Sequence, residues 1–319
     1  MDHIRFGNTD LSVSPMCLGT APFGLQTDKQ TAFQLLDAFW EVGGNFLDTA
    51  NVYCKWVPGK GNCSERIIGE WLRDRKPQDM VVATKGGHYS FLRPWVSRVT
   101  EKAVRSDLEE SLRALSKDCI DFYWLHRDNE ALSPDEISDF MEKLVREGKI
   151  RWWGISNLTA ARAEAFGDRL KGVSNQWSLA LESRKMAEKK DQTTIRTDGE
   201  MIRVLEEHTI PLVPYTSGAN GCFAAMEKGK PCHGLWDHPA NRLIFETLKK
   251  WAVKLDCSCY VLGQAWLLAQ PFEVFPVAAV SRREQIMDFE AICHLRIPEE
   301  CLQDIHGVLC EAEHLLTQE

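Results

Sequence analysis

Two hydrophobic patterns alternate along this chain. One is a short, nearly continuous apolar run, such as residues 80–85, which is typical of a strand covered on both faces. The other places apolar residues at helical spacing, as Leu35, Leu36 and Phe39 show within 31–42. Strands are predicted at 16–20, 45–50, 80–85, 120–126, 150–156, 173–178, 210–217 and 273–280. Helices are predicted at 31–42, from Ser64, across 104–115, from Ser133, at 159–170, 198–208, 239–256 and 258–270, from 282, and at 298–319.

The order of these segments predicts the fold class. Eight strands alternate with eight or more helices, and a helix on every return crossing makes neighbouring strands parallel. A closed (β/α)8 barrel, or TIM barrel, leaves no strand edge exposed. A doubly wound sheet is the alternative, but its dinucleotide-binding form has GxGxxG after the first strand, where this chain has none. We expect one TIM-barrel domain over 1–319, with an N-terminal β-hairpin at 4–15 and a C-terminal helix at 298–319.

Composition narrows the possible partners. The 319 residues carry a net charge of −8 and a sequence pI near 5.7, so they lack the excess of Lys and Arg that nucleic-acid binding needs. No apolar stretch reaches the length of a membrane span, and the N-terminus has no long apolar run. We expect no nucleic acid, no membrane contact and a cytoplasmic location. The eleven cysteines are scattered without CxxC, which favours reduced thiols over a disulfide framework or a metal site.

Titratable side chains stand where apolar strands stop. In a (β/α)8 barrel the active site lies at the carboxyl ends of the strands. The second, third and fourth predicted strands end at Asp48, Lys85 and His126, and Tyr53 lies five residues past the first of these. Alone, each is more typical of a capping acid, a surface lysine, a core histidine or a half-buried tyrosine. Their occurrence on three consecutive strands favours one site.

This combination predicts proton transfer to an oxygen atom. A lysine about 4 Å from a phenolate contributes roughly 4 kcal/mol of attraction at an effective dielectric of 20, or about three pKa units. Desolvation opposes the attraction. We expect the attraction to exceed it, which would lower the pKa of Tyr53, while Asp48 keeps Lys85 charged and His126 polarises a carbonyl. None of these side chains supplies a hydride, so a redox cofactor is implied.

These residues stand in motifs that resemble a known family. DTANVY with Asp48 and Tyr53, ATKGG with Lys85 and WLHRD with His126 resemble the catalytic tetrad of the aldo-keto reductase superfamily. The motifs GISN, NQW, PYTS and SRREQ follow in the same order and extend the resemblance over almost the whole chain. The resemblance implies a TIM barrel that binds NADPH, less often NADH, without a Rossmann domain. It also implies that Tyr53 is the general acid, tuned by Lys85 and Asp48, and that His126 places the substrate carbonyl.

The resemblance further implies where the cofactor binds. Polar residues after the fifth and sixth strands would hold the carboxamide, an aromatic side chain would stack on the nicotinamide, and the start of a later helix would surround the adenosine phosphate. Arg282 and Arg283 favour NADPH because a guanidinium matches phosphate oxygens, although both could instead be solvated; NADH stays possible. The expected cofactor contacts are Gly19, Thr20, Asp48, Ser156, Asn157, Gln176, Tyr215, Thr216, Ser217, Gly218, Gly221, Ser281, Arg282 and Gln285.

The residues after His126 bear on the substrate. Arg127 and Asp128 stand at a position that faces the substrate pocket in this family, where members acting on apolar carbonyl compounds often have an aromatic residue. The charged pair favours a polar, sugar-like substrate; alternatively, the two side chains pair with each other or cap the loop. The full set of expected substrate contacts is Phe23, Trp56, Trp95, Arg127 and Asp128.

The sequence therefore predicts an NAD(P)H-dependent enzyme that interconverts a small-molecule carbonyl compound and an alcohol. Two alternatives stay open: a physiological sugar or alcohol dehydrogenase, and an NADP-binding regulatory or non-catalytic subunit of the same fold. The charged segment 183–198 either closes over the site or forms solvated surface. Substrate identity, direction and oligomeric state are not determined by the sequence.

Overall fold

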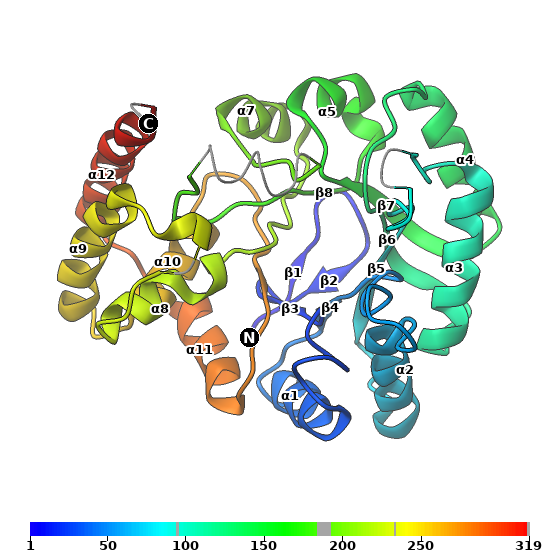
Figure 1. The fold of residues 1–319 in the computed structure, drawn as a ribbon, viewed down its shortest axis with the longest axis horizontal. Helices are drawn as coiled ribbons and strands as arrows, with labels where there is room; N and C mark the ends of the chain where they lie inside the picture. Colours follow the sequence, from blue (N-terminus) through cyan, green and yellow to red (C-terminus); the bar gives the residue numbers. More distant parts are fainter. Residues whose placement is uncertain (94–95, 184–192, 233, 318–319) are drawn as a thin grey trace.

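Parallel strands form a ring at the centre of the molecule, and helices surround it (Figure 1). The computed structural model describes residues 1–93, 96–183, 193–232 and 234–317. The strands are β1 (Ile4–Arg5), β2 (Ser12–Val13), β3 (Cys17–Gly19), β4 (Phe46–Asp48), β5 (Val81–Gly86), β6 (Ile120–Leu125), β7 (Ile150–Ser156), β8 (Val173–Ser174) and β9 (Val277–Ala278). In the ring, seven strands pair in parallel in the order β8-β7-β6-β5-β4-β3-β9, the arrangement predicted for a (β/α)8 barrel.

The strand predicted at 210–217 is reduced to isolated bridges. Leu212 bridges Val173 on one side and Val274 on the other, and this residue completes the ring between β8 and β9. The segment IPLVPYTS contains two prolines, which lack the N–H that a continuous ladder needs. The prediction of a full strand here is therefore wrong, although the position of the segment in the ring is as expected.

The helices follow the strands nearly as predicted. Ser133 illustrates why they begin where they do: its hydroxyl accepts from the Glu136 N–H, and the Glu136 carboxylate accepts from the Ser133 N–H. The α-helices are α1 (Lys29–Glu41), α2 (Cys63–Arg75), α3 (Glu101–Leu115), α4 (Pro134–Arg146), α5 (Ala160–Phe166), α7 (Gly199–His208), α8 (Cys222–Glu227), α9 (Pro239–Lys254), α10 (Cys259–Leu268), α11 (Arg283–His294) and α12 (Glu299–Thr317).

The N-terminal hairpin β1–β2 closes one end of the ring. Phe6, between the two strands, is fully buried. Its ring lies 5.7 Å from that of Phe46, 5.1 Å from Phe122 and 4.9 Å from Phe275, measured between centroids. These partners belong to strands or to the segment entering a strand, so the hairpin fills the amino-terminal end. The carboxyl ends of the strands remain for a site.

The C-terminal helix α12 packs beside α9, outside the ring of strands (Figure 1). The indole N–H of Trp251 in α9 donates to a carboxylate oxygen of Asp304 in α12 at 2.8 Å. In the part of the chain that the structure describes, no helix is both long enough and apolar enough to span a bilayer. That residues 1–319 form one domain stays a prediction.

Candidate active site

The four residues predicted to be catalytic come together at the carboxyl ends of β4, β5 and β6. The ammonium of Lys85 donates to Asp48 Oδ1 at 2.5 Å, to the Thr49 carbonyl at 2.8 Å and to the Tyr53 hydroxyl at 3.3 Å. The rings of Tyr53 and His126 lie 6.2 Å apart between centroids, edge to face. Parallel pairing of β4 with β5 and of β5 with β6 is what aligns these strand ends.

Lys85 is buried but keeps its charge. The side chains of Lys85 and Asp48 are each 3% exposed. Burial alone lowers the pKa of the Lys85 ammonium, but the Asp48 carboxylate and the Tyr53 oxygen more than offset this and hold its pKa above the ordinary value. The lysine therefore stays protonated near neutral pH and can donate to both oxygens.

Tyr53 differs from the expectation. Burial raises the pKa of its phenol above the ordinary value, and the attraction of Lys85 offsets this rise only in part because the Asp48 charge opposes it. The prediction that Lys85 brings the pKa of Tyr53 below its ordinary value is therefore wrong. The phenol is protonated at neutral pH and has a proton to give.

His126 is neutral at the same pH. Burial lowers the pKa of its imidazole well below the ordinary value, and the neighbouring His88, Arg127 and Lys85 lower it further. A neutral imidazole has one N–H donor and one acceptor nitrogen. Its Nδ1 atom is buried and has no hydrogen-bond partner among the described residues.

Aromatic rings line the site next to Tyr53 and His126. The Trp56 ring lies 6.3 Å from Tyr53 and 6.5 Å from Phe91, and His88 lies 5.5 Å from Phe91 and 4.8 Å from His126. Trp56 and Phe91 are 45% and 47% exposed, unusually open for rings of this size. Trp56 is among the residues predicted from the sequence, whereas His88 and Phe91 are not; their only signal is that they follow the third predicted strand, which ends at Lys85.

Asp128 is paired with an arginine of α5. Its carboxylate accepts from Arg162 Nε at 2.6 Å and Nη2 at 3.0 Å, and the two side chains are 9% and 16% exposed. Arg162 also donates to the Leu132 carbonyl at 3.1 Å. The structure thus gives Asp128 a partner from α5, and its contact with substrate stays a prediction.

The other expected substrate residues are divided between the core and the site edge. Phe23 is fully buried in the hydrophobic core, so the structure does not bring its ring into a substrate wall. The Arg127 guanidinium lies 5.7 Å from the Tyr89 ring centroid and donates to the Thr193 hydroxyl at 3.1 Å. Trp95 lies outside the described residues.

The polar residues expected at the nicotinamide form one hydrogen-bonded group. Asn157 Nδ2 donates to the His126 carbonyl at 3.2 Å and to the Ser156 hydroxyl at 3.0 Å. Its Oδ1 accepts from the Tyr215 hydroxyl at 2.5 Å and from the Ile195 N–H at 3.1 Å. Both polar atoms of the Asn157 side chain are therefore hydrogen-bonded, and they link the ends of the fourth, fifth and seventh strand positions.

Gln176 lies at the same edge and pairs with the end of the charged insertion. Its backbone N–H donates to the Ile195 carbonyl and its carbonyl accepts from the Thr197 N–H, both at 3.0 Å. It also forms a parallel bridge with Tyr215. The described end of segment 183–198 thus lies along this edge; its residues 184–192 lie outside the described part.

The segment expected beside the pyrophosphate has an unusual backbone. Thr216, Ala219, Asn220 and Gly221 have positive φ angles of 56°, 47°, 51° and 78°. Left-handed residues in a turn direct N–H groups towards a common concavity that suits anions. The Ser217 hydroxyl instead donates inward to a carbonyl of β9 at 2.8 Å, so only its backbone can serve such a role.

The start of α11 is the expected adenosine-phosphate region. Gln285 Oε1 accepts from the N–H groups of Ser281 and Arg282 at 3.0 and 3.1 Å. The side chain of Arg282 is 64% exposed, whereas Arg283 pairs with Glu41 of α1 at 2.5 Å. Both arginines are exposed, Arg282 at 64% and Arg283 at 58%, and the Arg282 ion pair, with Glu284 at 4.0 Å, is the longer of the two.

Gly19 and Thr20 lie where β3 meets the site. Gly19 pairs with Asp48 in the sheet, and the Thr20 hydroxyl donates to the Asp48 carbonyl at 2.9 Å. A Cβ on Gly19 would come within 2.9 Å of Val277, so this position excludes a side chain. Both residues support the backbone of the Asp48 strand.

Two buried polar atoms indicate that these residues fit a nicotinamide cofactor. Asp48 Oδ2 and His126 Nδ1 have no hydrogen-bond partner among the described residues. Buried polar atoms are nearly always paired, so unmet hydrogen-bonding capacity beside Tyr53 suits a bound molecule with ribose hydroxyls or a carbonyl group. Within the described ranges no cluster of His, Cys, Asp or Glu is arranged to hold a metal.

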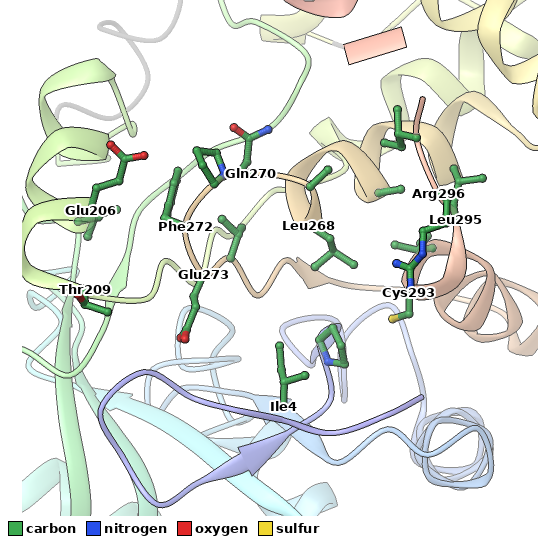
Figure 2. A pocket seen from close by; sticks show the side chains of 18 of the residues that line it. Ile4, Glu206, Thr209, Leu268, Gln270, Phe272, Glu273, Cys293, Leu295 and Arg296 are labelled. Atoms are coloured by element: carbon green, nitrogen blue, oxygen red, sulfur yellow. The ribbon is translucent and has the colours of Figure 1, made fainter. Parts of the chain in front are cut away.

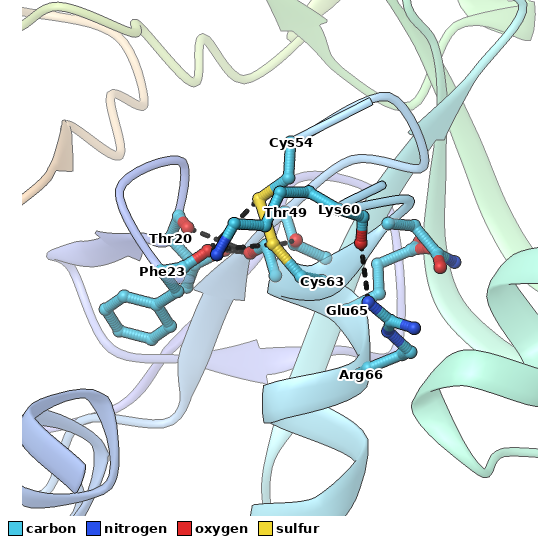
Figure 3. Close-up of a disulfide and its surroundings, with 10 residues drawn as sticks. Thr20, Phe23, Thr49, Cys54, Lys60, Cys63, Glu65 and Arg66 are labelled. Atoms are coloured by element: carbon cyan, nitrogen blue, oxygen red, sulfur yellow. Dashed lines mark hydrogen bonds between the residues drawn. A yellow bond between two sulfur atoms is a disulfide. The ribbon is translucent and has the colours of Figure 1, made fainter. Parts of the chain in front are cut away.

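Two disulfides flank this region, so the expectation of reduced cysteines is wrong for these four residues, while the other seven cysteines are free as expected. Cys54, directly after Tyr53, is bonded to Cys63 at the start of α2 (Figure 3). Cys222, directly after the pyrophosphate segment, is bonded to Cys232. The spacings of 9 and 10 residues match no CxxC-type motif, so folding and not sequence spacing pairs these sulfurs.

A pocket of about 860 Å³ lies away from Tyr53, Lys85 and His126 (Figure 2). Its lining includes Ile4 of the hairpin and residues that follow the carboxyl ends of α7, α10 and α11, namely Thr209, Ala269 and Leu295. Helices of such a barrel end where the next strand begins. This pocket is therefore at the end opposite Tyr53.

The comparison with known proteins identifies the class. A model of the aldo/keto reductase family matches residues 15–309, so the chain belongs to this family. It is an NAD(P)H-dependent oxidoreductase with the (β/α)8 fold of that family. The solved structure of aldo-keto reductase AKR11C1 from Bacillus halodurans, in its holo form, superposes with a TM-score of 0.77 over 97% of this chain and 96% of that one, at 24% identity.

Curated relatives are similar over nearly the whole chain. Norsolorinic acid reductase of Aspergillus flavus is 27% identical, with 95% of this chain and 79% of that protein covered. The uncharacterized oxidoreductase YrpG of Bacillus subtilis is 28% identical, with 97% and 96% covered. Aryl-alcohol dehydrogenase GME11368 of Pestalotiopsis microspora is 28% identical, with 93% and 79% covered.

Proposed function

We propose that this enzyme interconverts an aldehyde or ketone and the corresponding alcohol, with Tyr53 as the proton donor in reduction. The observation that carries the proposal is the position of the Lys85 ammonium, 2.5 Å from Asp48 and 3.3 Å from the Tyr53 hydroxyl, in a buried site. A buried cation stabilises negative charge that develops on the phenol oxygen as the proton leaves. Asp48 holds that cation in place.

The remaining residues orient the substrate. His126 is neutral and stands edge to face with Tyr53, so an N–H of its imidazole is suited to bind the same carbonyl oxygen that receives the proton. The bound nicotinamide cofactor supplies the hydride. The edge that would hold the nicotinamide is bordered by Ser156, Gln176 and Tyr215. Asn157 is hydrogen-bonded to Ser156 and Tyr215, and Gln176 forms a bridge with Tyr215.

The cofactor is proposed to be NADPH. Arg282 lies at the start of α11, where backbone N–H groups and the helix dipole favour an anion, and its side chain is exposed. A guanidinium there suits the 2′-phosphate that distinguishes NADPH from NADH. Arg283 is less available because it pairs with Glu41.

We propose that the substrate is an aromatic carbonyl compound. Trp56, Phe91 and His88 form a nearly continuous series of ring contacts from Tyr53 to His126, and planar rings stack favourably on such a surface. Relatives named for norsolorinic acid and aryl alcohols support this choice. A sugar-like substrate is the second candidate, and it rests on Arg127 at the edge of the same site.

Substitution of Tyr53 by Phe tests the proposal. It removes the hydroxyl and keeps the ring, so we expect kcat for NADPH-dependent reduction of an aromatic aldehyde to fall by about 10²- to 10⁴-fold. Quenching of protein fluorescence by NADPH should be retained, because the phenol is not proposed to hold the cofactor. An unchanged kcat would show that another group donates the proton.

A further inference from the structure

The Cys54–Cys63 disulfide lies next to Tyr53 in the chain and close in sequence to Trp56 of the proposed substrate wall. Cys54 follows Tyr53, and Cys63 begins α2, so the bond closes a loop that carries Trp56. Figure 3 shows the two sulfurs between the Phe23 and Thr20 segment on one side and α2 on the other. The bond therefore joins the loop that carries Trp56 to a helix of the barrel.

The site around the sulfurs is closely packed. Cys54 is fully buried and Cys63 is 7% exposed. Their sulfurs lie 3.2 and 3.7 Å from the Phe23 carbonyl oxygen. A side chain on Gly24, which has a φ of 83°, would collide with the Cys63 sulfur, so a glycine makes room for it.

The backbone of Cys54 is held in an unfavourable conformation. Its φ of 77° lies in the left-handed region, which residues other than glycine rarely adopt. The bond to Cys63 holds this conformation together with two turn hydrogen bonds, from the Lys55 N–H to the Val52 carbonyl and from the Val57 N–H to the Cys54 carbonyl, both at 2.9 Å. Without the bond, the backbone between Tyr53 and Trp56 can return to an ordinary conformation.

Other contacts keep this loop near the barrel when the bond is broken. The Lys55 ammonium donates to Asn51 at 2.7 Å and to Glu110 at 2.6 Å. A guanidinium N–H of Arg66 donates to the Lys60 carbonyl at 2.5 Å. Breaking the disulfide should therefore change where Trp56 points without unfolding the loop.

We propose that the Cys54–Cys63 disulfide sets the position of Trp56 and makes the enzyme select aromatic over small aliphatic carbonyl compounds. The inference rests on the proposed function. In the oxidised protein Trp56 stands 6.3 Å from Tyr53, where its ring forms one wall for a flat substrate. In the reduced protein this wall is displaced, and the selectivity falls while proton donation by Tyr53 continues.

The reduction step needs a dithiol. A thiolate of the dithiol attacks one sulfur of the bond and releases the other as a thiolate, which takes up a proton. The second thiol of the reagent, as its thiolate, then attacks the reagent sulfur of the mixed disulfide and releases the remaining cysteine as a thiolate, which is protonated. Cys54 and Cys63 each end as a thiol, and the reagent, which has given two electrons and two protons, ends as a cyclic disulfide.

The test compares two substrates in two redox states of the full chain. The kcat/KM of benzaldehyde and of propanal is measured with NADPH, in oxidised protein and after treatment with dithiothreitol, and alkylation followed by mass spectrometry reports the state of Cys54 and Cys63. We expect the benzaldehyde-to-propanal ratio to fall by about 3- to 10-fold on reduction, the range of one aromatic contact. An unchanged ratio, or an oxidised protein without the Cys54–Cys63 bond, overturns the proposal.

Three variants distinguish the effect of the Cys54–Cys63 disulfide on the ratio from other effects of dithiothreitol on the protein. Trp56→Ala should show the low ratio in both redox states, and Cys54→Ser/Cys63→Ser should show it without dithiothreitol. Cys222→Ser/Cys232→Ser, which removes the other disulfide, should keep the full response of the ratio to reduction. If neither aldehyde is reduced by any form of the protein, the proposed function fails; if both are reduced at one fixed ratio, only the role of the disulfide fails.

Discussion

The ammonium of Lys85 lies 3.3 Å from the phenol oxygen of Tyr53; Lys85 is buried and Tyr53 is half-buried. This contact does not make the phenol acidic, because burial and the Asp48 carboxylate together outweigh the attraction of the cation. It leaves Tyr53 protonated and Lys85 charged, the pairing suited to giving a proton to a carbonyl oxygen.

Replacing Lys85 by Met should destabilise the fold. The substitution leaves the Asp48 carboxylate buried without its cation, and breaking a buried pair in this way costs about 3–5 kcal/mol. Urea denaturation followed by tryptophan fluorescence measures the loss. The double variant Asp48→Asn/Lys85→Met should recover most of the free energy of unfolding but not the activity. A loss below about 1 kcal/mol in the single variant would contradict a buried ionic pair.

The rate of carbonyl reduction should be nearly independent of pH around neutrality. Burial holds the pKa of Tyr53 above its ordinary value and that of His126 well below its own, so neither group changes charge between about pH 7 and pH 9. Above that range kcat/KM should fall as Tyr53 loses its proton. A steady rise of kcat/KM from pH 7 to 9 would contradict the role of Tyr53 as donor.

Stability should decline on the acid side because of His126. Its folded pKa is depressed, so as pH falls below about 6.5 the unfolded chain binds a proton that the folded protein does not. The free energy of unfolding therefore decreases with falling pH in this window. His126→Gln should show a shallower decrease between pH 6.5 and 5 in urea titrations, and an equal slope in both proteins would assign the effect elsewhere.

Asp128→Asn should affect stability more than substrate binding. The Arg162–Asp128 contact is bidentate and mostly buried, so losing the charge costs about 1–3 kcal/mol. The KM for the carbonyl substrate should stay within about twofold, since the carboxylate already has its partner. Arg162→Gln is the matched control and should give a similar loss. A large rise of KM in Asp128→Asn, with no such rise in Arg162→Gln, would favour a polar substrate that contacts Asp128.

Arg282→Ala should weaken the binding of NADPH and not of NADH. The loss of a charge-assisted contact to the 2′-phosphate corresponds to about 1.5–3 kcal/mol, or about 10- to 150-fold in Kd. Arg283→Ala is the matched control, with a smaller effect because Arg283 pairs with Glu41. Fluorescence titration with both cofactors measures the change. Equal weakening of NADPH and NADH by Arg282→Ala would contradict a phosphate-specific role.

The alternation of strands and helices and the residues at the strand ends were predictable from the amino-acid sequence. Apolar runs and helical spacing are local signals, and parallel strands that end together bring their last residues together, so Asp48, Lys85 and His126 were predictable as neighbours. Capping is equally local, as Ser133 and Glu136 show. The aldo/keto reductase family followed from the same strand-end motifs.

The hydrogen-bond or ion-pair partner of each polar group, and the extent of its desolvation, are set by the tertiary structure. Asp128 meets Arg162 across 34 residues, and Cys54 meets Cys63 because α2 begins beside the Tyr53 loop. The sign of the pKa shift at Tyr53 depends on the balance between burial and two opposite charges, which spacing along the chain does not encode. Desolvation and pairing are properties of the packed interior, so they appear only once the barrel is assembled.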